Sequence, residues 1–301
     1  MKSLSQRKVQ EKISLFLFLL PTLLFVFVFI AYPVAYSGYL SFTEFNYATD
    51  DKPTFIGFKG YIDTLTDDSL FRTALYNQVR FAIPYFIITF VGSLGLAIIV
   101  GELTKGVQIF QIIFYLPMII ALSMAGIAFS WILKEDVGIF NHFLETIGLS
   151  SLTRNWFSNP DTALYGLVVV RAWKMMGFTF IIFLSGVHGI PLSLREAARV
   201  DGASFLQEVF HIIIPLLRPY MLVSGIWVII NSLKVFDLPQ VVTQGGPGVA
   251  TLTLYLYSWK AAFQRYDLGL AAQVAYITAF IILLLSWGLN KLLQPESVER
   301  F

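Results

Sequence analysis

Six long apolar stretches, separated by polar segments, dominate the chain. Each is close to the ~20 residues that an α-helix needs to cross the hydrocarbon core of a membrane. They run from Ile13 to Ala35, Tyr76 to Gly101, Gln108 to Leu133, Ala163 to Val187, Leu216 to Phe236 and Ala271 to Leu292. The pattern predicts an all-α, polytopic membrane protein with six transmembrane helices.

The polar segments between these stretches differ in length. The turn from Glu102 to Val107 is short, so the second and third stretches should form an antiparallel pair. Longer segments follow the first, third and fifth stretches, at Tyr36 to Leu75, Lys134 to Thr162 and Asp237 to Leu270. These three are predicted to be external, and Gly138 to Gly148 to be a short amphipathic helix.

The basic N-terminus, Met1 to Lys12, followed by an apolar run is also how a secretory signal begins. However, the run exceeds a typical signal core and no clear A-x-A site follows it, which favours an uncleaved first span. The expected organisation is an N-terminus at 1–12, a transmembrane domain at 13–292 and a tail at 293–301.

The basic residues suggest which side of the membrane each polar segment occupies. On one side lie Lys2, Arg7, Lys8, Lys12, Lys105, Arg195, Arg199, Arg218, Lys291 and Arg300. On the other lie Lys52, Lys59, Arg72, Lys134, Arg154, Lys260 and Arg265. Short loops rich in Lys and Arg stay in the cytoplasm. We therefore expect both termini, and the segment around Arg195, to be cytoplasmic.

Composition narrows the function classes. Only 13% of residues are charged and 56% are hydrophobic, whereas soluble domains carry about 25% charged residues. Net charge is +2, so no nucleic-acid partner is implied. The chain has no cysteine and three scattered histidines, so neither a disulfide framework nor a metal site is expected.

The most distinctive polar segment runs from Arg195 to Pro215. Ser193 to Glu196 reads as a capping box that starts a helix, and Asp201-Gly202 as its end. Ser204 to Gln207 reads as a second capping box, and Pro215 as a helix break or the first turn of the next helix. The segment predicts a helix-turn-helix, either an ordinary cytoplasmic loop or a knob that enters another protein's groove.

Arg171, Lys174 and Lys234 are basic residues that lie within the predicted spans. Each would cost about 2.5–3.5 kcal/mol at the centre of a lipid-facing helix, so they should face protein or water. Arg171 and Lys174 share one helical face with Met175 and Phe178. A second stripe carries Trp227, Asn231, Lys234 and Leu238, with Ser232 and Val235 beside it.

Polar groups interleaved with aromatic rings suit a sugar, whose hydroxyls take hydrogen bonds and whose ring faces stack. The alternative is polar packing between helices. Two or three unpaired bases in a wet cavity would attract anions, so an acidic saccharide is one hypothesis and a neutral saccharide the other.

Enzymatic signals are lacking. The sequence holds no G-x-x-x-x-G-K-[ST] phosphate loop, and no Ser-His-Asp order or paired catalytic carboxylates stand out, so catalytic residues are predicted to be absent. An ion-coupled carrier would need an acid inside a span, and only Asp237, at a span's end, comes near. A membrane scaffold or receptor remains a second rival.

One motif goes further than local physics. Glu196-Ala197-Ala198, Gly202, Ile212 and Ile214-Pro215 resemble the EAA loop of bacterial ABC importer permeases, with Ile214 in place of its leucine. Other stretches resemble carbohydrate permeases of the maltose type, in particular the first of their two permease subunits. These are Leu20-Pro21-Thr22, Tyr115-Leu116-Pro117, Trp173 with Gly177-Phe178, Ile190-Pro191, Phe236-Asp237 and Thr243 to Pro247.

The resemblance implies a permease with the EAA loop at 192–215 in a bacterial cytoplasmic membrane, importing a saccharide by alternating access. Its partners would be a second homologous permease, two ATPase subunits that bind ATP and Mg²⁺, and an external solute-binding protein; this chain would hold no cofactor. Glu196, Ala197, Ala198, Asp201 and Gly202 would form the contact with the ATPase. The sugar site of the family falls, by position, on Arg171, Lys174, Met175, Phe178, Asn231, Ser232 and Val235.

Overall fold

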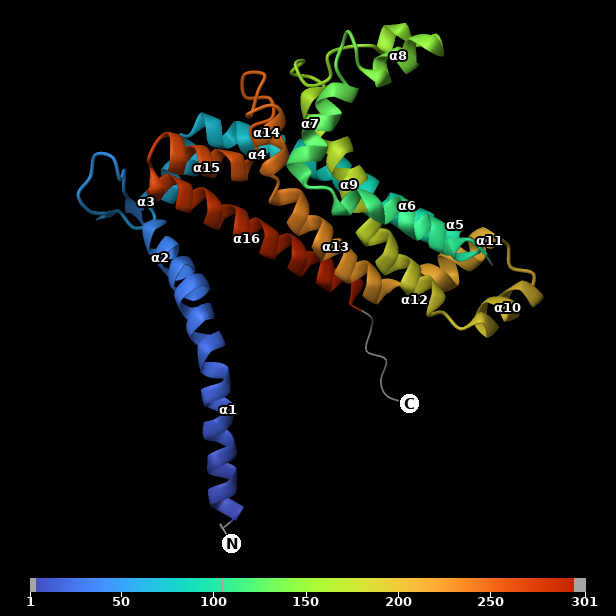
Figure 1. Ribbon diagram of the computed structural model, residues 1–301, viewed down its shortest axis with the longest axis horizontal. Coiled ribbons are helices and arrows are strands. Elements are labelled where there is room, and N and C mark those ends of the chain that lie inside the picture. Colours follow the sequence, from blue (N-terminus) through green and yellow to red (C-terminus); the bar gives the residue numbers. More distant parts are fainter. Residues whose placement is uncertain (1–3, 104, 295–301) are drawn as a thin grey trace. The chain divides into compact units, whose positions relative to one another are not determined.

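The computed structural model describes residues 4–103 and 105–294, which are mostly helical (Figure 1). Five helices are long and apolar enough to cross a membrane, and a bent helix pair supplies a sixth crossing if it counts as one span. The five are Ser14–Leu40, Ser69–Gly101, Ala163–His188, Arg218–Val242 and Leu268–Leu293. The polytopic helical architecture is therefore confirmed.

The chain divides into two compact units. The first comprises Met1–Asp67 and Lys260–Tyr276. It holds α1 (Leu4–Val26), the π-helix η1 (Phe27–Ala31), α2 (Tyr32–Leu40), β1 (Thr43–Glu44), β2 (Thr54–Phe55) and α3 (Lys59–Thr66). β1 and β2 pair antiparallel, a small sheet that the helical pattern does not predict. Within this unit the Thr64 hydroxyl donates to the Gln273 side chain at 3.0 Å.

The second unit comprises Asp68–Trp259 and Ile277–Phe301. Its helices are α4 (Ser69–Phe86), η2 (Ile87–Val91), α5 (Gly92–Gly101), α6 (Val107–Ile119), α7 (Leu122–Ile132), α8 (Ile139–Thr146), η3 (Ser150–Leu152), α9 (Ala163–His188), α10 (Leu192–Val200), α11 (Phe205–Glu208), η4 (Val209–Ile213), α12 (Ile214–Leu216), α13 (Arg218–Leu233) and α14 (Asp237–Val242). Helices α15 (Leu254–Gln264) and α16 (Leu268–Leu293) belong partly to each unit.

Helix α9 forms the centre of the second unit and packs against α4, α5, α6 and α13. Its buried apolar side chains include Leu164, Leu167, Phe180, Phe183 and Leu184. The approach to α6 is close at Gly177, where an added Cβ would lie 1.9 Å from the Phe114 carbonyl oxygen. Only glycine fits there, so this residue sets how near the two helices can lie.

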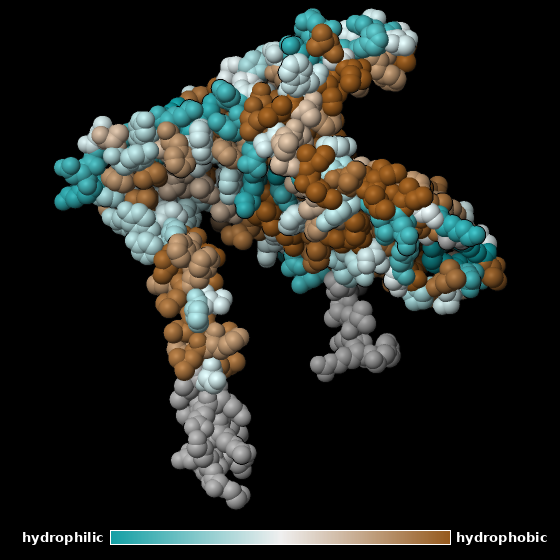
Figure 2. Space-filling view, viewed as in Figure 1, coloured by the Kyte–Doolittle hydropathy of each residue, from teal (hydrophilic) through white to brown (hydrophobic). Residues whose placement is uncertain are grey.

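Helix α6 turns an apolar surface outward. Ile109, Ile112, Ile113 and Leu116 are all more than half exposed, and hydrophobic residues gather over this helix in Figure 2. Such a surface suits lipid or another apolar helix rather than water.

The third span differs from its prediction. Residues 108–133 were expected to form one helix, but α6 and α7 meet at a bend of 99°. Ile120 and Ala121 have extended backbone between them, with ψ of 134° and 136°. Pro117, which lacks an N–H, lies in the last turn of α6 and weakens the helix just before the bend.

The start of span two and the helix between Gly138 and Gly148 can also be compared with their predictions. Span two begins at Ser69 rather than Tyr76, because the Asp68 carboxylate caps the helix by accepting from Leu70 N at 2.9 Å and Phe71 N at 3.0 Å. The short amphipathic helix expected between Gly138 and Gly148 is present as α8.

The close contact at Gly177 yields a stability prediction. Gly177→Ala should destabilise the protein by about 1–3 kcal/mol because α6 must move away from α9. Gly95→Ala is the matched control, since an added Cβ there meets nothing within 4 Å. Thermal unfolding in detergent measures both variants, and a Gly177→Ala protein as stable as Gly95→Ala would contradict this packing.

Candidate functional site

The predicted helix-turn-helix is present at one end of the second unit, as α10 followed by α11 (Figure 1). Gly202 lies in the turn with φ +83°, a left-handed conformation that favours glycine. The Ser204 hydroxyl accepts from Gln207 N at 3.4 Å, while Gln207 Oε1 accepts from Ser204 N at 2.8 Å. The second capping box is therefore confirmed, and we call residues 192–208 the hairpin.

The first capping box is wrong. Helix α10 begins at Leu192, and its N-cap is Pro191, which provides no side-chain hydrogen bond. Ser193 lies inside the helix, because Pro191, three residues after the end of α9, has extended backbone and α10 begins directly after it. Pro215 occupies the first turn of α12, one of the two roles expected of it.

The outer face of the hairpin is open. Glu196, Ala197, Asp201 and Gly202 are exposed, and Ala198 is half-buried. Val200, next to the turn, is 87% exposed. These residues place a small, partly charged surface where another protein could contact it.

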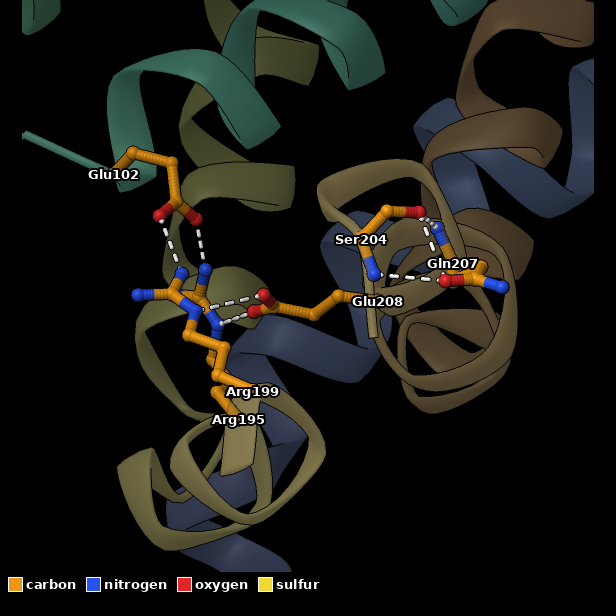
Figure 3. A network of polar contacts seen from close by, with 6 residues as sticks. All are labelled: Glu102, Arg195, Arg199, Ser204, Gln207 and Glu208. Atoms are coloured by element: carbon orange, nitrogen blue, oxygen red, sulfur yellow. Dashed lines mark hydrogen bonds and ion pairs between the residues drawn. The ribbon is translucent and has the colours of Figure 1, made fainter. Parts of the chain in front are cut away.

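The inner face of the hairpin carries a ring of four charges that sequence reasoning missed (Figure 3). Arg195 and Arg199, one turn apart on α10, each contact both Glu102 and Glu208. Arg199 Nη2 donates to Glu102 Oε2 at 2.9 Å and its Nε to Glu208 Oε2 at 3.0 Å. The i,i+4 spacing of the two arginines was a visible signal, but nothing in the sequence points to Glu102, which lies 93 residues before Arg195.

The part of the ring formed by Glu208 and Arg195 is buried. The Glu208 side chain is 1% exposed and that of Arg195 is 9% exposed. Burial of the Glu208 carboxyl opposes its ionisation, but the hydrogen bonds and charges of Arg195 and Arg199 outweigh this and hold the pKa of Glu208 below its ordinary value of 4.5. The Glu208 carboxyl is therefore ionised at neutral pH.

Arg171 and Lys174, expected to face protein or water, are buried, whereas Lys234, of which the same was expected, is exposed at the C-cap of α13. Arg171 is 5% exposed and Lys174 is 6% exposed. Lys174 Nζ donates to the Met118 carbonyl at 2.8 Å, in the last turn of α6. Arg171 Nη2 donates to the Asn231 carbonyl at 3.0 Å, in the last turn of α13. Both carbonyls lack a helical partner because their helices end there.

Of the remaining residues predicted for a sugar path, Met175 and Phe178 lie on α9, Asn231 and Ser232 lie on α13, and Val235 follows the end of α13. Met175, Phe178 and Asn231 are half-buried, whereas Ser232 and Val235 are buried. The Phe178 ring lies 4.7 Å from that of Trp227, centre to centre. The predicted stripe on span five is interrupted, because α13 ends at Leu233 and Leu238 belongs to α14.

Comparisons with known proteins relate most of the chain to one family. Residues 106–296 match the family described as binding-protein-dependent transport system inner membrane component. The probable ABC transporter permease protein YurN of Bacillus subtilis (strain 168) is 33% identical, over 92% of this chain and 94% of that protein. The sulfoquinovosyl glycerol transport system permease protein SmoG of Agrobacterium fabrum (strain C58 / ATCC 33970) is 31% identical, over 89% and 86%.

A solved structure supports the fold. A chain of a bacterial ABC transporter involved in the import of the acidic polysaccharide alginate matches with a TM-score of 0.81. The match covers 96% of this chain and 98% of the other at 22% identity. At this identity the likeness speaks for the architecture alone.

The buried end of the ring yields a pH prediction. Glu208→Gln should cost about 3 kcal/mol at neutral pH, because the buried Arg195 must then share the single carboxylate of Glu102 with Arg199. A lowered pKa in the folded state means that this stabilisation is present above pH 4.5 and is lost as pH falls through the folded pKa. The difference in melting temperature between wild type and Glu208→Gln should therefore persist down to pH 4.5 and shrink below it.

Glu145→Gln, on the exposed surface of α8, is the matched control and should melt like wild type. If the difference in melting temperature between wild type and Glu208→Gln already vanished near neutral pH, the result would contradict an ionised Glu208.

Proposed function

The chain belongs to the family of binding-protein-dependent transport system inner membrane components, and we propose that it is one permease subunit of an ATP-driven importer that carries a saccharide inward. As a family member it is a multi-pass inner membrane protein and a transport subunit rather than an enzyme. The observation that carries the proposal is the exposed hairpin, which lies within the matched region.

The hairpin is the part that would receive the work of ATP hydrolysis. Its exposed carboxylate at Glu196 suits a basic contact, and the small residues Ala197 and Ala198 allow a partner backbone to come near. Gly202 makes the turn that ends α10. We assign these residues and Asp201 to the docking surface for an ATPase subunit, with ATP and Mg²⁺ held by that partner.

The complex that this role requires has further members. Two ATPase subunits, a second homologous permease and an external solute-binding protein would complete it. The hairpin and both termini would then face the cytoplasm, in line with the basic residues on that side.

An ion-coupled carrier is a poor alternative. Its mechanism needs an ionisable acid within the membrane. In the described ranges 4–103 and 105–294, the five candidate spans and the bent pair contain one acid, Asp237, at the start of α14.

The saccharide path would follow α9 and α13. Met175, Phe178 and Asn231 offer a half-buried apolar and amide surface. Arg171, Lys174, Ser232 and Val235 lie behind it and shape it. A saccharide cargo also agrees with the printed name of the relative SmoG.

An acidic saccharide is a second candidate for the cargo. Arg171 and Lys174 lie one turn apart, and among the described residues neither forms an ion pair with a carboxylate. Their uncompensated positive charge would attract an anion even though each also donates to a carbonyl. The alginate transporter of the same fold makes this candidate worth testing.

Docking at Glu196 generates the first functional prediction. Glu196→Lys reverses the exposed charge without touching the ring, so the protein should insert normally but transport at least tenfold more slowly, as expected when a contact worth about 1.4 kcal/mol is lost. Transport in vesicles, at equal membrane levels, measures the effect. Glu145→Lys on α8 is the control, and wild-type transport by Glu196→Lys would refute the docking assignment.

The cargo's charge has its own test. If an acidic saccharide is carried, Arg171→Gln should raise its KM about tenfold or more, corresponding to a lost charged contact of at least about 1.4 kcal/mol, and that of a neutral analogue far less. Arg171→Lys, which keeps the charge, should retain most of the preference for the anion. Arg80→Gln, which removes an exposed guanidinium stacked on Tyr76 and Tyr165, is the control. Equal increases in KM for the acidic saccharide and the neutral analogue would show that Arg171 has a structural role.

A further inference from the structure

Glu102 lies outside the hairpin, yet it is part of the charged ring. It is the C-cap residue of α5, and its backbone N–H donates to carbonyls of the last helical turn. Its side chain reaches both arginines of α10, with one carboxylate oxygen for each (Figure 3). The end of span two is thereby joined to the hairpin by side chains.

Every residue of the ring contacts two residues of opposite charge. Each arginine is held by two carboxylates and each carboxylate by two arginines, so two positive charges balance two negative ones. The Nε and Nη2 atoms of each guanidinium are both used, which fixes its plane as well as its position. Such an arrangement resists rotation of α10 more than a single ion pair would.

The backbone joins α10 to its neighbours by less rigid connections. Helix α9 ends at His188, and Pro191 before α10 has extended backbone with ψ of 128°. The turn after α10 passes through Gly202 in the left-handed region. Neither joint is helical, so a displacement of α10 would be partly absorbed there unless side chains carried it further.

Helix α5 lies where it can transmit a displacement of α10 to α9. α5 packs along α9, and near its end an added Cβ at Gly101 would lie 2.6 Å from Val187 Cγ1. The last turn of α5 therefore contacts the last turn of α9 directly. α9 also holds Arg171 and Lys174, which bond to the ends of α13 and α6.

We propose that Glu102 is a positioning residue for energy coupling: through Arg195 and Arg199 it passes the movement of the hairpin to α5 and so to α9. This inference rests on the proposed role of the hairpin as the ATPase-docking element. It assigns a role to Glu102, which lies 94 positions before Glu196 in the sequence and outside the docking surface.

The test uses the complete transporter reconstituted in vesicles, with saccharide import and ATP hydrolysis measured together. Glu102→Gln should keep its ATPase subunits and hydrolyse ATP, but move about fivefold fewer saccharide molecules for each ATP. Glu145→Gln, the same substitution on exposed α8, should leave that ratio unchanged. Combining Glu102→Gln with Arg199→Gln should lower the ratio little further, because both break one connection.

A covalent crosslink in place of the Glu102–Arg199 ion pair tests whether this connection transmits movement or only adds stability. The chain has no cysteine, so Glu102→Cys with Arg199→Cys can be joined by a short crosslinker that reacts with two thiols. The joined protein should regain most of the import per ATP that the unjoined double variant loses.

Two results would overturn the inference. One is a wild-type ratio of import to hydrolysis in Glu102→Gln. The other is a loss of import that follows only from lost ATPase subunits, which would make the ring a support for docking. Failure of the proposed function looks different, since Glu196→Lys would then transport normally and the wild-type chain would purify without an ATPase.

Discussion

Inside a membrane every backbone polar group needs a partner within the protein, because lipid offers none. Helices α6 and α13 both end within a candidate crossing, and each end frees carbonyl groups. Side chains from neighbouring segments supply the missing donors. Lys174 serves Met118, Arg171 serves Asn231, Gln78 serves Ser232 and Thr253 serves Val235. The broken helices, and the half-buried surface between them, depend on these four bonds.

The same reliance on side chains appears at the hairpin. The two backbone joints of α10, at Pro191 and Gly202, are not helical, whereas α11 continues directly into η4. The ring of Arg195, Arg199, Glu102 and Glu208 fixes α10 instead. A purely apolar contact would hold the hairpin as tightly but would allow it to slide. Charged groups with fixed hydrogen-bond directions specify one orientation. The proposed coupling role of the hairpin requires a fixed orientation more than it requires added stability.

Much of this could be predicted from the sequence, and the misses have physical reasons. Apolar length gave the spans, and the Gly202 turn and the Ser204 cap were local signals that the structure confirms. The bend between α6 and α7 was missed because hydropathy is as high across it as within a straight span. Glu102 was missed because its partners come from a distant segment, and no local pattern records such a contact. The cost of a charge in lipid correctly placed Arg171 and Lys174 inside, although not their carbonyl partners.

The most direct test of the account is where the tip of the hairpin lies and what covers it. Val200→Cys introduces a single, highly exposed thiol at that tip into a chain without cysteine. The account predicts that an impermeant thiol reagent fails to label it in intact cells, labels it in inside-out vesicles stripped of ATPase, and labels it much more slowly once the ATPase is restored. Labelling from outside intact cells, or equal labelling with and without the ATPase, would contradict the account.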